Sequence, residues 1–168
     1  MTRVFAMPNA ATFAMPPVRA FLERYRCEAG LSVDPFAGSS RIAHITNDLR
    51  DVGAAHRLDA LAFLERLRDD GTRPDLVLFD PPYSLRQLKE CYESAGLAFG
   101  KRDGWRPNRW TAERDVIAAI LAPGGVVLSF GWSSNGMGKA RGFELQEVLL
   151  VNHGAGHHDT ICVAERAA

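Results

Sequence analysis

The feature that most constrains this 168-residue sequence is a set of short, almost wholly apolar runs, above all LVLF at 76–79 and VVLSF at 126–130. Such runs are typical of strands buried on both faces of a parallel sheet, because helices then cover both faces. Segments with helical spacing of apolar residues separate the runs. The sequence therefore predicts an α/β fold with a mostly parallel sheet, built as one domain over residues 1–168.

The last two predicted strands are joined by a short loop. They must pair as an antiparallel hairpin, because a parallel return needs a dozen or more residues. The residues before position 16 are predicted to be irregular. Spacing and Gly/Pro punctuation predict strands at 31–36, 42–48, 76–80, 126–130, 143–151 and 160–166, and helices at 16–26, 58–71, 84–95 and 112–122.

Composition narrows the class of protein without naming a function. Twenty basic and twenty acidic residues balance, so there is no surplus positive charge for strong non-specific binding to phosphates. Cys27, Cys91 and Cys162 are widely spaced, which is typical of reduced thiols in a cytoplasmic protein rather than of a disulfide framework or a zinc site. No apolar stretch is long enough to span a membrane.

The sequence Asp80-Pro81-Pro82-Tyr83 follows directly on the apolar run LVLF. Ligands of open α/β sheets bind beyond the carboxyl ends of the strands, so this tetrapeptide is expected at the site of reaction. The two prolines fix the backbone and lack an N–H, so their carbonyls project as acceptors. Proline and aspartate are also common in turns, and a plain turn is the structural alternative.

The residues of this tetrapeptide suit one kind of chemistry. An exocyclic amine of a nucleic-acid base is a poor nucleophile because its lone pair is conjugated with the ring. Hydrogen bonds from its two protons to Asp80 and to the Pro81 carbonyl would localise that lone pair for attack on a methyl sulfonium. Tyr83 would stack on the base, which must be extruded from a duplex to be reached.

With these motifs the chain resembles the amino-directed DNA methyltransferases that carry a D/N/S-P-P-Y/F sequence, in particular the small adenine-specific enzymes of phages and mobile elements. The resemblance implies a Rossmann-like class I fold, S-adenosylmethionine as the cofactor and double-stranded DNA with an extruded base as the partner. It places catalysis at Asp80, Pro81, Pro82 and Tyr83.

The same resemblance implies where the cofactor binds. Asp34-Pro35-Phe36-Ala37-Gly38 resembles the family's glycine loop after the first strand, and Thr12-Phe13 resembles a segment that packs over the cofactor. Asp48 resembles the acidic residue that takes the ribose hydroxyls or the methionine end. The implied cofactor-binding residues are Phe13, Asp34, Phe36, Ala37, Gly38, Asp48, Asp59 and Ala60.

The sequence departs from the family at one place. Only Ser39, Ser40 and Arg41 separate Gly38 from the next predicted strand, which is too short for the usual crossover helix. Either this helix is lost or one of the two strands is misassigned. No separate target-recognition domain is predicted, so the choice of sequence falls to loops, to a second copy of the chain or to a specificity partner.

Two further segments carry basic side chains next to the predicted site. Basic and aromatic residues mix in 99–110, and the glycine-rich segment 130–142, predicted to be flexible, follows a strand toward the site. Ordinary surface loops explain both segments equally well. The expected nucleic-acid contacts are Lys101, Arg102, Arg106, Arg109, Lys139 and Arg141.

Several alternatives remain open. Cytosine N4 presents a similar amine to the same clamp, as does guanine N2 in RNA. A non-catalytic cofactor-binding or nucleic-acid-binding module would fit the shortened crossover. A dinucleotide oxidoreductase is disfavoured because no G-x-G-x-x-G follows any strand. The segment HGAGHHD at 153–159 is interpreted as a tight turn at the rim of the site rather than as a metal site.

Overall fold

A computed structural model describes residues 1–9, 11–50, 52–100 and 110–168. These form one seven-stranded sheet with the strand order β1-β6-β7-β5-β4-β2-β3. The strands are β1 (Thr2–Phe5), β2 (Ser32–Asp34), β3 (Ile45–Thr46), β4 (Leu76–Phe79), β5 (Val126–Gly131), β6 (Phe143–Asn152) and β7 (Thr160–Ala167). The helices are α1 (Pro16–Arg26), α2 (Ala60–Asp69), α3 (Leu85–Ser94) and α4 (Thr111–Ile120), with short 3-10 turns η1 (Thr12–Ala14) and η3 (Lys139–Arg141).

The sheet is parallel except at one strand. β7 lies between β5 and β6 and is antiparallel to both, and every other neighbouring pair runs parallel. The predicted fold class, a mostly parallel sheet with a C-terminal antiparallel hairpin, is therefore confirmed.

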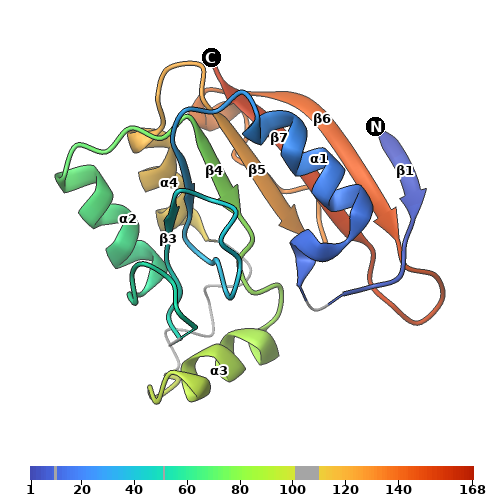
Figure 1. Ribbon diagram of the computed structural model, residues 1–168, viewed down its shortest axis with the longest axis horizontal. Helices are drawn as coiled ribbons and strands as arrows, with labels where there is room; N and C mark the ends of the chain where they lie inside the picture. The colour runs from blue at the N-terminus through green and yellow to red at the C-terminus, as the bar shows by residue number, and fades with distance from the viewer. Residues whose placement is uncertain (10, 51, 101–109) are drawn as a thin grey trace.

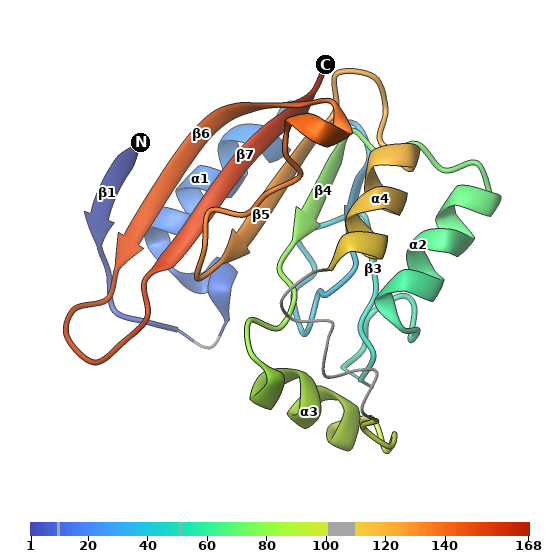
Figure 2. The same ribbon diagram turned by 180° about the vertical axis from the view of Figure 1, so that it is seen from behind.

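Helices cover both faces of the sheet, as Figures 1 and 2 show from opposite sides. Side chains alternate along each strand, so Leu78 packs into the core under α1 while Phe79 packs into the core under α2 and α4. The apolar runs of β4 and β5 are buried along their whole length, as the sequence predicts for central strands.

The prediction for the first residues is wrong. Thr2–Phe5 is not irregular but forms the edge strand β1, which pairs in parallel with β6 from Thr2↔Leu149 to Phe5↔Asn152. This strand is short and mostly exposed, so its sequence lacks a clear apolar pattern. Pairing with a partner almost 150 positions away along the chain determines its conformation.

No crossover helix stands between the two strands predicted on either side of Gly38, and both strands form. β2 and β3 pair in parallel through Val33↔Ile45 and Asp34↔Thr46, and residues 35–44 connect them with turns only. The helix is dispensable because the strands are so short. The connection has to run back only along the three residues of β2, a distance of about 10 Å, which residues 35–44 span easily. His44, at the end of this connection, is hydrogen-bonded to Ser32 at the start of β2, with 2.8 Å between its Nδ1 and the serine Oγ.

Candidate active site

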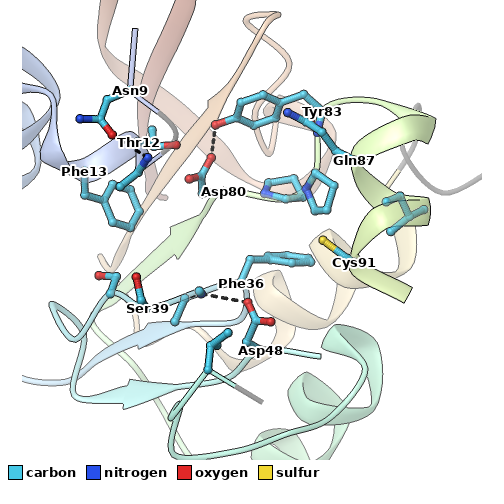
Figure 3. Close-up of a pocket in the computed structure, with 18 of the residues that line it drawn as sticks. Asn9, Thr12, Phe13, Phe36, Ser39, Asp48, Asp80, Tyr83, Gln87 and Cys91 are labelled. Carbon is cyan, nitrogen blue, oxygen red and sulfur yellow. Dashed lines mark hydrogen bonds between the residues drawn. The ribbon is translucent and has the colours of Figure 1, made fainter. Parts of the chain in front are cut away.

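A large cavity opens at the carboxyl ends of the parallel strands, where the sequence places the reaction. Its volume is about 1210 Å³, and it extends from the 3-10 turn η1, past the loop after β2, to the start of α3. Figure 3 shows side chains from these three segments arranged around the cavity. All but one of the predicted catalytic and cofactor-binding residues line it, namely Phe13, Phe36, Ala37, Gly38, Asp48, Asp59, Ala60, Asp80, Pro81, Pro82 and Tyr83.

Asp34 is the exception, because it lies beneath the cavity rather than in its wall. Its carboxyl group is fully buried, and Oδ1 accepts a hydrogen bond from the Phe36 N–H at 3.0 Å. Burial, with smaller contributions from the charges of Asp80 and Asp48, raises the pKa of Asp34 well above its usual value. Asp34 therefore shapes the turn that carries Phe36 and Gly38 into the cavity.

Asp48 stands at the predicted place after β3 but is fully engaged by protein donors. Oδ2 accepts from the Gly38 N–H at 2.9 Å, and Oδ1 accepts from the Arg50 N–H at 2.8 Å. The Arg50 guanidinium adds Nε to Oδ1 at 2.9 Å and a terminal nitrogen to Oδ2 at 3.1 Å. A carboxylate offers about four acceptor sites, so all of them are taken. A ligand hydroxyl reaches Asp48 only if the Arg50 side chain moves.

Asp59 caps a helix as well as lining the cavity. Its Oδ1 accepts from the Leu61 N–H at 3.1 Å at the start of α2, and its Oδ2 lies 3.4 Å from the Tyr92 hydroxyl. Ala60 follows as the first residue of the helix and is buried. The carboxylate is thus held by the helix start, which is a common use of aspartate at this position.

The catalytic tetrapeptide forms the loop from β4 to α3. Ser84 begins α3 by capping it, and the Gln87 side chain accepts from the Tyr83 N–H at 2.7 Å. The Tyr83 hydroxyl donates to Asp80 Oδ1, and Figure 3 shows the Thr12 side chain beside both groups. These contacts hold the Asp80 carboxylate toward the cavity.

The electrostatics of this loop are unusual for an acid. Burial raises the pKa of Asp80 from 3.8 to about 6, although hydrogen bonds from Tyr83 and Thr12 oppose the rise. Burial and the neighbouring Asp80 charge raise the pKa of Tyr83 well above its usual value. At neutral pH the site therefore holds a carboxylate acceptor beside an uncharged phenol.

The sequence did not point to an aromatic pair, Trp132 and His158, whose tryptophan lies beside Tyr83. The Trp132 ring centroid lies 5.6 Å from that of Tyr83, and His158 stacks on the indole with 4.2 Å between centroids. Trp132 is 41% exposed at the mouth of the cavity. The sequence signal for Trp132 is its place directly after the buried strand β5, at the carboxyl edge of the sheet.

The nucleic-acid contacts predicted at Lys139 and Arg141 are not beside the catalytic loop. Both lie in η3, which leads into β6, and β6 runs parallel to β5. Their place is therefore the opposite end of the sheet, near the C-terminus in Figure 2. Arg141 is paired there with Asp115 on α4, at 2.6 Å between Nε and Oδ1. Lys101, Arg102, Arg106 and Arg109 lie outside the described residues.

The segment 130–142, predicted to be flexible, is joined to β7 by hydrogen bonds. Glu165 of β7 accepts hydrogen bonds from the backbone N–H groups of Met137 and Gly138. Gly136 permits this approach, because a Cβ there would stand 1.8 Å from a Glu165 carboxylate oxygen. The segment thus runs back along the sheet as a strap attached to β7.

The histidines of 153–159 take different roles, as expected for a turn at the rim. His153 is buried, with Nδ1 2.7 Å from the Ala6 carbonyl and Nε2 2.9 Å from the Thr160 hydroxyl. His158 is exposed on Trp132. Within the ranges that the structure describes, no three His, Cys, Asp or Glu side chains gather to hold a metal ion, and no helix is long and apolar enough to cross a membrane.

Comparisons with known proteins give a fold but no family. No family model matches the chain, and no curated protein sequence is detectably similar. Among solved structures, TrmN from Thermus thermophilus aligns with a TM-score of 0.51 and 21% identity, over 92% of this chain and 49% of that one. SMU.776, a protein complexed with S-adenosylhomocysteine, gives 0.55 and 9%, over 83% and 45%.

The N-methyltransferase NodS from Bradyrhizobium japonicum is similar over more of its own length. It aligns with a TM-score of 0.56 and 13% identity, over 88% of this chain and 93% of NodS. This chain spans about half the length of TrmN and of SMU.776. At such identities the likeness concerns the fold alone. The chain has the Rossmann-like fold of S-adenosylmethionine-dependent methyltransferases.

Proposed function

We propose that the chain transfers a methyl group from S-adenosylmethionine to an exocyclic amino nitrogen of a nucleic-acid base, with N6 of adenine in DNA as the first candidate. One observation carries the proposal. The half-buried carboxylate of Asp80, the rigid Pro81–Pro82 turn and the Tyr83 ring line the same cavity as the glycine loop at Gly38.

The chain's own groups suit the activation of an amine. Asp80 and the Pro81 carbonyl are two acceptors for the two N–H donors of the amine. Because the pKa of Asp80 is about 6, the group is ionised at neutral pH and accepts the amine proton readily as the nitrogen becomes cationic. Tyr83 and Trp132 offer aromatic faces that replace the stacking lost by an extruded base.

The cavity also fits the cofactor that the resemblance implies. Its volume of about 1210 Å³ exceeds the 300–1,000 Å³ usual for one small ligand, which leaves room for a cofactor and a base together. Asp48 would hold the ribose hydroxyls after Arg50 moves, and Phe36 would provide an apolar wall. When bound, S-adenosylmethionine supplies an electrophilic methyl group on a sulfonium.

The structure gives one reason to keep a second candidate function, a non-catalytic binding module. The Arg50 guanidinium takes the two acceptor sites of Asp48 that the backbone N–H groups of Gly38 and Arg50 leave, so the carboxylate expected to hold the cofactor is fully engaged. If Arg50 does not move, the cofactor affinity is lost while the fold persists. Cytosine N4 and guanine N2 in RNA remain alternatives within the enzymatic proposal, since both present the same amine.

Calorimetry separates the two candidate functions before any substrate is known. The wild-type chain and Arg50→Ala are titrated with S-adenosylmethionine, followed by S-adenosylhomocysteine. The enzymatic proposal expects binding by the wild type and binding that is equal or tighter in Arg50→Ala. Binding only after Arg50 is removed would favour the non-catalytic module, and no binding by either protein would overturn the cofactor assignment.

A further inference from the structure

A second cavity adjoins the main one behind the catalytic tetrapeptide. Its volume is about 320 Å³, and it shares Pro81, Pro82, Tyr83, Trp110 and Trp132 with the main cavity but not Asp80. Its other walls come from the end of β5, the start of α4 and the residues that follow β5. The tetrapeptide therefore stands between a cavity that contains its carboxylate and a smaller one that does not.

Ser129 of β5 faces this second cavity. Phe79 and Ser129 are partners in the register of β4 and β5, and both line the cavity. Their neighbour Leu128 packs on the opposite face, in the core under α1. Because side chains alternate along a strand, the Ser129 hydroxyl points toward α4 and the cavity.

Two buried polar groups at this cavity have no partner among the residues that the structure describes. One is the Ser129 Oγ, in a residue that is 4% exposed, and the other is the indole Nε1 of Trp110, which is 5% exposed. The great majority of buried polar groups in proteins are hydrogen-bonded, so unpaired ones need an explanation. Two of them lining one cavity indicate a ligand with complementary acceptors.

The walls of the cavity define the chemistry of this ligand. Phe79, Trp110, Tyr83 and Trp132 provide aromatic surface, which suits a flat ring. The Trp110 N–H is a donor only, and the Arg114 guanidinium lies 5.3 Å above the Phe79 ring. No Asp or Glu stands among the described residues that line the cavity, so a ligand rich in acceptors is favoured over a cation.

We propose that this second cavity binds the ring edge of the methyl-accepting base, with the Trp110 N–H and the Ser129 hydroxyl donating to its ring nitrogens or carbonyl. The inference rests on the proposed function and names the residues that read the base. A base at Tyr83 would present its amine to Asp80 on one side and its ring acceptors to Ser129 and Trp110 on the other. Ser129 and Trp110 are then specificity-determining residues.

The test compares two buried serines that differ in their partners. Ser32 is 1% exposed, and its hydroxyl is bonded to His44, whereas Ser129 is unpaired. We expect Ser129→Ala to raise KM for unmethylated duplex DNA about 5- to 30-fold, the loss of one hydrogen bond, with kcat little changed. Its Tm should stay equal or rise, because an unpaired hydroxyl is removed. Ser32→Ala should lower Tm and leave KM unchanged.

A second variant and a second probe keep the outcomes distinct. Trp110→Phe keeps the ring, removes the N–H and should raise KM in the same way. If the wild type methylates DNA and Ser129→Ala has the wild-type KM, the inference is overturned and the proposed function stands. If the wild type does not methylate, quenching of 2-aminopurine deoxyriboside by the wild type more than by Ser129→Ala still supports the ring site. Equal quenching, or none, would overturn it.

Discussion

Replacing Asp80 by asparagine should make the protein more stable and less active at the same time. Burial raises the pKa of Asp80 from 3.8 to about 6, and each unit of such a shift corresponds to about 1.4 kcal/mol. The ionised carboxylate therefore costs the folded state up to about 3 kcal/mol above pH 6. The amide of Asp80→Asn carries no charge and still accepts the hydrogen bond from Tyr83.

The sign of the pH dependence follows from the direction of the shift. Since the pKa of Asp80 is higher in the folded state, the folded wild type binds more protons than the unfolded chain between pH 4 and 6. Its stability relative to Asp80→Asn therefore falls as pH rises through this window. The variant should gain about 1–3 kcal/mol at pH 8, a rise in Tm of roughly 2–10 °C, and no more than a small fraction of that at pH 4.

Urea unfolding of the wild type and of Asp80→Asn at pH 4, 6 and 8 measures the gain in stability. A methyl-transfer assay of both proteins measures the loss of activity. An amide oxygen is a weaker acceptor than a carboxylate, so kcat should fall by roughly 10- to 100-fold. The wild-type rate should also fall below about pH 6, and Asp80→Asn should lack this acid limb. A gain in stability that is the same at all three pH values, or a loss at pH 8, would refute the reasoning.

Three further substitutions test other parts of the site. Asp48→Asn should weaken the binding of S-adenosylmethionine about 10- to 100-fold in calorimetry, and an unchanged Kd would remove this residue from the cofactor site. Trp132→Ala should raise KM for DNA about 5- to 100-fold through lost stacking while cofactor affinity stays constant, and the reverse pattern would contradict a role in base stacking. Glu165→Gln should lower the free energy of unfolding by about 1.5–3 kcal/mol in urea, since two backbone N–H groups lose a charged acceptor; a wild-type value would show that the strap needs no such anchor.

The central fold could be predicted because its signals are local. The runs at 76–79 and 126–130 are apolar along their length, and the short loop before Thr160 admits only a hairpin. The strand β1 could not be predicted, because Thr2–Phe5 becomes a strand only through its distant partner β6. Counting residues after Gly38 left two alternatives, a lost helix or a misassigned strand, and could not show that two such short strands would still pair.

In the candidate site, too, the sequence predicted what local motifs determine and missed what depends on contacts between side chains or distant segments. Asp80 and Gly38 were placed correctly because motifs after parallel strands meet at one edge of the sheet. The position of Arg141 was wrong, because nothing in the segment after β5 shows that it turns back to the opposite end. The saturation of Asp48 by Gly38 and Arg50 depends on local geometry that sequence spacing does not reveal.

The most direct test of the central claim is the identity of the product. The purified chain is incubated with S-adenosylmethionine and unmethylated duplex DNA or RNA, with Asp80→Ala in parallel, and the digested nucleosides are quantified by mass spectrometry. The account predicts N6-methyladenine in DNA from the wild type and none from Asp80→Ala. N4-methylcytosine would support the role of Asp80 and the Pro81 carbonyl in binding the amine but would assign cytosine as the substrate base. No methylated base in either nucleic acid, with no binding of S-adenosylmethionine, would contradict the account.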